Sequence, residues 1–124
     1  MYLARVIATC SNASISLCVF AQESLVGKYS GSYVSRAYGG DRDVGLTINV
    51  TSVENNVVKG TATNYSQGCA GDYPFEGKLN GTDLVLRSSK KGGRAGDCGF
   101  GFRGNVEGNA LVGNMGSLPV KVFK

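Results

Sequence analysis

The sequence predicts an all-β protein, folded as an eight-stranded antiparallel up-and-down meander barrel. Glycine is frequent, with 19 residues among 124, whereas proline occurs only 2 times. Short segments alternate apolar and polar residues and end at turn residues, a pattern typical of strands. Beyond residue 24, no window keeps apolar residues at helical spacing without glycine or β-branched interruption. A sandwich of two sheets is the alternative architecture, and the length allows one domain.

Alternation at period two defines the strands. The eight expected strands span residues 26–35, 43–53, 56–65, 73–79, 83–89, 98–107, 109–115 and 118–123. Three connections, at 54–56, 80–83 and 107–109, carry the Asn and Gly residues of tight hairpins, so successive strands should pair antiparallel. Closure into a barrel would remove the exposed edges of an open sheet.

The long connections share one end of the predicted meander. They span 35–43, 64–73 and 88–98, and as the first, third and fifth connections they fall at the same end. Cys69 lies in the third connection and Cys98 closes the fifth. We therefore expect a disulfide between them, which in the chain-entropy model contributes roughly 3 to 4 kcal/mol.

The first 21 residues differ from the rest of the chain. Arg5 ends a short basic segment, an apolar stretch follows, and residues 19–21 (VFA) suit a signal peptidase. We expect 1–21 to be a signal peptide and 22–124 a single β-barrel domain, periplasmic or secreted, with no transmembrane segment in the mature protein. Removal of Arg5 would lower the formal net charge from +4 to about +3. Because the chain has no His and no C-x-x-C pair, we expect no metal and no cofactor.

Glycines sit within the predicted strands, on the face of the apolar residues. Phe75-x-Gly77-x-Leu79 and Phe102-x-Gly104-x-Val106 show the pattern. Such glycines either let the strands coil tightly or leave a hollow for a ligand. The apolar residues expected inside are Tyr29, Tyr33, Leu46, Ile48, Val50, Val58, Phe75, Leu79, Leu84, Leu86, Phe102, Val106, Leu111, Met115, Val120 and Val122. They are enough to fill most of the interior, so the first reading is favoured, and any pocket would be a shallow cup under the long loops.

Cations gather in the long connections. We expect Arg42, Lys90, Lys91 and Arg94 to contact an anion, and Tyr38 to offer a stacking surface. The predicted function is a non-catalytic exported binding module for a small anionic ligand or acidic group. The alternative is a protein-interaction or inhibitor module that presents the same loops. A monomer is expected, and nucleic-acid binding is not favoured because the basic stretch is short.

Other side chains of these connections offer stacking surfaces and carboxylates. Tyr65 and Tyr73 flank the loops and could add stacking surface, and Arg36 adds a cation. Without His or a free thiol, the usual nucleophile and base pairs are missing, so an enzyme is not expected. A hydrolase using two of the loop carboxylates is the remaining enzymatic alternative. Those carboxylates are Asp41, Asp43, Asp72 and Asp97.

The runs GKYSGSY, LTINV, VVKGTATNYSQGCAGDYPFEGKL and LVGNMG resemble a set of small exported bacterial proteins of unknown function. This resemblance spans residues 25–123 and implies export but no activity. The meander is also similar in architecture to avidin-like and lipocalin-like barrels. The chain has no Trp, whereas avidin's biotin site and the lipocalin signature both require it. The architectural likeness therefore implies no ligand.

Overall fold

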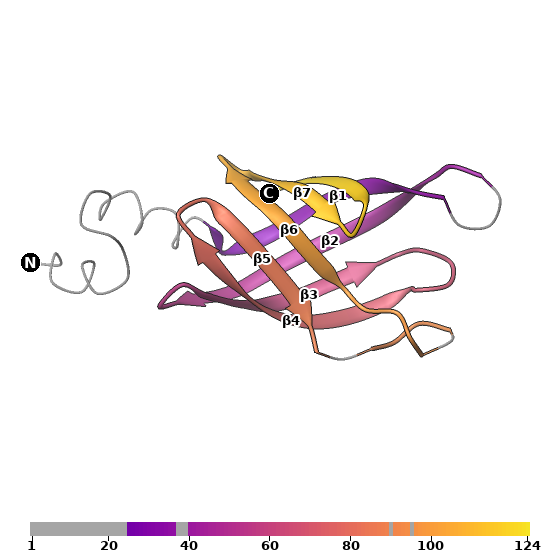
Figure 1. Ribbon diagram of the computed structural model, residues 1–124, viewed down its shortest axis with the longest axis horizontal. Coiled ribbons are helices and arrows are strands. Elements are labelled where there is room, and N and C mark those ends of the chain that lie inside the picture. Colours follow the sequence, from indigo (N-terminus) through magenta and orange to yellow (C-terminus); the bar gives the residue numbers. More distant parts are fainter. Residues whose placement is uncertain (1–24, 37–39, 90, 95) are drawn as a thin grey trace, which may run out of the picture.

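A computed structural model describes residues 25–36, 40–89, 91–94 and 96–124. Eight strands follow one another without a crossover (Figure 1). They are β1 (Gly27–Ser35), β2 (Arg42–Glu54), β3 (Val57–Asn64), β4 (Gly71–Asn80), β5 (Asp83–Ser88), β6 (Gly101–Glu107), β7 (Ala110–Met115) and β8 (Leu118–Phe123). The segment 1–21, predicted to be a signal peptide, lies outside the described residues.

The sheet closes into a barrel, which confirms the predicted fold class over a sandwich. Each strand pairs antiparallel with its neighbours in sequence, and β1 pairs with β8 through the register Ser30↔Phe123 to Tyr33↔Val120. The strand boundaries agree with the predicted ones within two residues, except that β6 begins at Gly101 instead of residue 98. The reason is that Cys98 forms a separate bridge with Gly92 before β6 starts.

The two ends of the barrel differ. The connections β2–β3, β4–β5 and β6–β7 are tight turns, in which Asn55 and Asn56 have φ of 52° and 65° and Gly81 and Gly108 have φ of 64° and 62°. These left-handed conformations explain the Asn and Gly residues of the turns. The long connections β1–β2, β3–β4 and β5–β6 lie together at the right-hand end in Figure 1, as the meander predicts.

Apolar side chains fill the barrel interior. Of the sixteen residues expected inside, fourteen are buried, while Val106 and Met115 are partly buried and pack against this core. Tyr29 is 0% exposed, and its hydroxyl donates to the backbone oxygen of Leu25 at 2.7 Å, where the chain enters the barrel. The interior of this barrel is therefore a packed core.

The inward glycines let neighbouring strands approach closely. A Cβ added to Gly104 would lie 2.6 Å from the Cα of Gly113, its cross-strand partner. One added to Gly77 would lie 2.8 Å from Cδ2 of Leu86 on β5. Since carbon atoms pack at about 3.5 to 4.0 Å, neither position has room for a side chain. The glycines thus serve the tight coiling of the wall, and their missing side chains leave no hollow there.

Candidate functional site

The cysteines Cys69 and Cys98 form a disulfide, as predicted, with a Cα–Cα distance of 5.6 Å. It joins the β3–β4 connection to the β5–β6 connection, and hydrogen bonds reinforce the junction. The backbone N–H of Arg94 donates to the oxygen of Gly68 at 2.9 Å, and Gly92 and Cys98 exchange two hydrogen bonds at 2.8 and 2.9 Å. We call this braced surface the rim and define it as residues 65–70, 91–94 and 96–100.

Aromatic side chains close the barrel beneath the rim. Tyr73, Phe75 and Phe100 are 2%, 5% and 5% exposed, and the rings of Phe75 and Phe100 lie 5.7 Å apart. The Tyr73 hydroxyl donates to the backbone oxygen of Cys69 at 2.6 Å. Burial, with a smaller contribution from nearby Tyr33, raises the pKa of Tyr73. The prediction that Tyr73 offers an exposed stacking surface is therefore wrong, because its ring belongs to the core.

Asn64 organises the start of the rim, a role that the sequence reasoning missed. Its Oδ1 accepts a hydrogen bond from the Tyr33 hydroxyl at 3.0 Å and another from the Ser66 N–H at 2.9 Å. The hydroxyl oxygen of Ser66 in turn accepts from the N–H of Cys69 at 3.2 Å. Asn side chains often accept a hydrogen bond from the backbone N–H two residues further on, where the chain turns. Asn64 at the end of a strand, before a long connection, was therefore the available signal.

The predicted cations divide between two parts of the loop end. Lys91 and Arg94 are exposed on the β5–β6 connection, within the rim. Arg42, also exposed, is the first residue of β2, and the strand order places the β1–β2 connection four strands from the β5–β6 connection in a closed barrel of eight. Tyr38 and Lys90 lie outside the described residues. One small ligand is therefore not expected to span Arg42 together with the cations of the rim.

The other charged side chains of the loop end, and its exposed tyrosine, do not join the cations of the rim in one site. Arg36 and Asp41 approach to 3.9 Å, and both side chains are 72% exposed, so the pair contributes little stability. The carboxylate of Asp72 accepts from the Thr63 hydroxyl at 2.7 Å. Tyr65 remains 62% exposed at the loop end and is available for stacking.

Within the described part of the chain, no three His, Cys, Asp or Glu residues are grouped to hold a metal ion.

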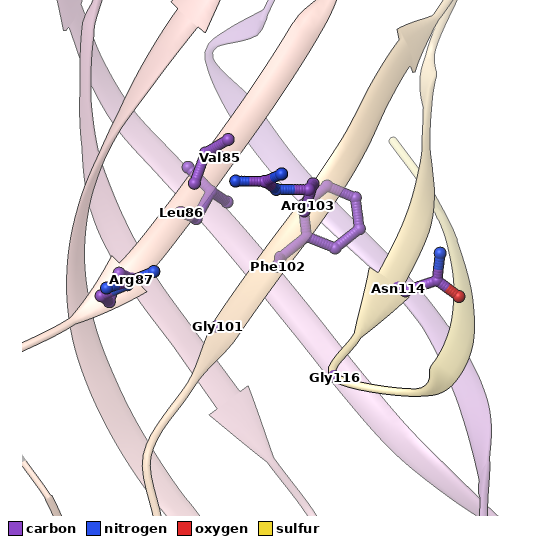
Figure 2. A pocket seen from close by; sticks show the side chains of 8 residues that line it. All are labelled: Val85, Leu86, Arg87, Gly101, Phe102, Arg103, Asn114 and Gly116. Atoms are coloured by element: carbon purple, nitrogen blue, oxygen red, sulfur yellow. The ribbon is translucent and has the colours of Figure 1, made fainter.

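Two hollows lined by described residues lie on the outer wall, where none was predicted. The larger, of about 440 Å³, crosses β5, β6 and the β7–β8 turn (Figure 2). It is lined by Val85, Leu86, Arg87, Gly101, Phe102, Arg103, Asn114 and Gly116. The smaller, of about 300 Å³, crosses β7, β8, β1 and the start of β2 and includes Val34, Asp43, Pro119 and Lys121. Arg87 and Arg103, which point outward from neighbouring strands, were a usable signal for the larger hollow. Each of them alone is typical of an ordinary surface residue.

The described residues contain no helix long and apolar enough to serve as a membrane span. When the chain is compared with known protein families, with curated proteins and with solved structures, none of the three comparisons finds a match.

Proposed function

We propose that this chain is an exported, non-catalytic binding module that presents the rim to an acidic surface of a protein partner. The observation that carries the proposal is the packed interior beneath a cross-linked surface. Tyr73 and Phe100 are buried under the long connections, the place where any pocket would have been a shallow cup, and the disulfide holds the two connections above them together. A surface held in place before binding loses less conformational entropy on association.

The charge of the rim supports an acidic partner. Lys91 and Arg94 are exposed and lie on the connection that the disulfide braces. No described carboxylate forms an ion pair with either side chain. Exposed cations of this kind raise the association rate with a negatively charged partner and make binding sensitive to salt. Export agrees with the leader-like segment 1–21 and with the disulfide, which persists in oxidising compartments.

The test uses charge reversal at the rim and on the wall. The oxidised chain, the double variant Lys91→Glu/Arg94→Glu and the control Lys28→Glu/Lys121→Glu are immobilised and exposed to envelope and secreted proteins of the source cell. A partner of the rim should be retained by the wild type and the control, be lost by the rim variant, and dissociate as salt is raised.

A thermal-shift screen with small anions such as phosphate and citrate tests the competing function. A melting temperature that rises with one of these anions, and does so in the wild type but not in the rim variant, would indicate a small anionic ligand. Equal capture of the same proteins by the wild type and the rim variant would refute the rim as the contact surface.

A further inference from the structure

The larger outer hollow lies where the β5–β6 pair extends beyond the turn that joins β7 to β8. Strands β6 and β7 pair from Glu107↔Ala110 to Arg103↔Asn114, after which β7 turns back through Gly116, with φ of 60°. Strand β6 and the residues before it extend past this turn. Figure 2 shows Gly101 on β6 and Gly116 on the turn, on opposite sides of the hollow that both residues line.

Among the described residues, the backbone of Gly101 has no hydrogen-bond partner on the side of this hollow. The Ser88 N–H donates to the oxygen of Phe100 at 2.8 Å, and the Phe100 N–H donates to the Ser88 hydroxyl oxygen at 2.9 Å. The peptide groups of Phe100 therefore face β5. Because successive residues of an extended chain direct their peptide groups to opposite sides, those of Gly101 and of Gly99 face away from β5. Among the described residues, neither glycine has a hydrogen bond on that side.

Two guanidinium groups line the hollow near this short backbone edge, Arg103 on β6 itself and Arg87 on the other side of β6, on β5. Arg87 is the cross-strand partner of Gly101, and Arg103 follows Gly101 by two residues, so all three share the outer face of the wall. Both arginines are exposed, and no carboxylate of the described residues lies within ion-pair distance of either. The nearest register neighbour of opposite charge, Glu76, has its own ion pair with Lys59 at 3.9 Å.

The floor of the hollow suits an extended chain better than a stacked ring. Gly101 has no side chain, and a Cβ built there would meet no atom closer than the oxygen of Leu86 at 4.0 Å. Phe102 lines the hollow but is 2% exposed, and Val85 is half-buried. Among the described lining residues, therefore, no exposed aromatic face is available for a sugar or a nucleobase.

We propose that this hollow binds an acidic peptide segment in extended conformation. The segment would pair its backbone with Gly99 and Gly101, as in β-strand addition, and place its carboxylates on Arg87 and Arg103. The backbone pairing supplies affinity for any extended chain, and the two arginines select acidic side chains that the segment directs to the outer face of the wall. This proposal rests on the proposed function in one respect, that the partner is a protein, and it adds a second contact, which shares Gly99 with the rim and extends from there onto the outer wall.

The experiment is a titration of the oxidised, full-length chain with hexaglutamate, followed by amide NMR. We expect the amide signals of Gly99 and Gly101 to shift and their hydrogen exchange to slow. The double variant Arg87→Gln/Arg103→Gln should weaken the affinity about tenfold or more, since two charge-assisted contacts are lost. Gly101→Val should also weaken it, by filling the hollow at a position where the fold has room, whereas Lys28→Gln on β1 should leave it unchanged.

Other outcomes would overturn the proposal. Inorganic phosphate that shifts the Gly99 and Gly101 amides as hexaglutamate does would show that the arginines bind anions without selecting a peptide. Polygalacturonate that binds more tightly than hexaglutamate would assign the hollow to acidic polysaccharides. Absence of binding by hexaglutamate at millimolar concentration would remove the site. The rim variant Lys91→Glu/Arg94→Glu separates the two proposals, because it should abolish partner capture yet leave the amide shifts with hexaglutamate intact.

Discussion

Gly104 and Gly101 lie three residues apart on β6, and the same substitution should affect them in opposite directions. In Gly104→Ala the new Cβ would lie 2.6 Å from the Cα of Gly113 and would also meet the backbone of Val112. Separation of β6 and β7 by about 1 Å would be needed to restore normal carbon contact. In Gly101→Ala the nearest atom is the oxygen of Leu86 at 4.0 Å, so no movement is needed.

The magnitudes follow from three effects. Overpacking costs about 1 to 3 kcal/mol, and each weakened ladder hydrogen bond costs about 1 kcal/mol more. Replacement of glycine by alanine returns about 0.4 to 1 kcal/mol by restricting the unfolded chain. We expect Gly104→Ala to lower the free energy of unfolding by about 2 to 3 kcal/mol, and Gly101→Ala to raise it by about 0.5 kcal/mol.

Urea unfolding of the oxidised chain provides the measurement, with circular dichroism as the signal because the chain has no Trp. At about 1 to 1.5 kcal/mol per molar urea, the midpoints of the two variants should differ by about 2 M. Equal midpoints would refute the conclusion that close strand approach, and not local chain flexibility, accounts for the inward glycines.

Three further predictions concern the disulfide and the aromatic side chains. Replacement of Cys69 and Cys98 by serine should lower the free energy of unfolding by roughly 3 to 4 kcal/mol, since the cysteines are 29 residues apart; an unchanged urea midpoint would contradict this. Phe100→Ala should cost about 3 to 5 kcal/mol, because it empties a position in the core next to Phe75; a loss below 1 kcal/mol in the same assay would show that the loop end is not packed. Burial raises the pKa of Tyr29 and of Tyr73 above the ordinary value of 10.0, so both phenols ionise more readily in the unfolded chain. Their contribution to stability should be complete below pH 10 and be lost as the pH rises toward the folded-state values, a loss that Tyr29→Phe and Tyr73→Phe should each reduce in alkaline unfolding curves.

The strands and the cross-link were predictable because they depend on local patterns and on simple topology. Alternation of side chains located the strands, and Asn and Gly located the tight turns. The parity of the meander places Cys69 and Cys98 at one end of the barrel, where the structure has their disulfide.

The features that the sequence did not predict correctly also have physical explanations. Tyr73 and Phe100 join the core in the same alternation as Phe75 and Phe102, but both stand beside long connections, where the pattern does not mark how far the packed wall extends. Arg42 is far from the cations of the rim because the β1–β2 and β5–β6 connections lie across the closed barrel from each other. This separation becomes clear only once the closed strand order is known. The outer hollow forms because β7 turns back while the chain before β6 continues. The alternation of apolar residues carries no information on where two paired strands part.

The sulfur bridge is not part of the strand pairing. All eight strands find their hydrogen-bonding neighbours through the ladder, while the bridge connects only the segments above it. A reductant would therefore release the two connections of the rim from each other, and would affect the wall only through the roughly 3 to 4 kcal/mol of stability lost with the bridge. Redox conditions outside the chain would thus act on the order of the rim and, through the lost stability, on the folded fraction as well.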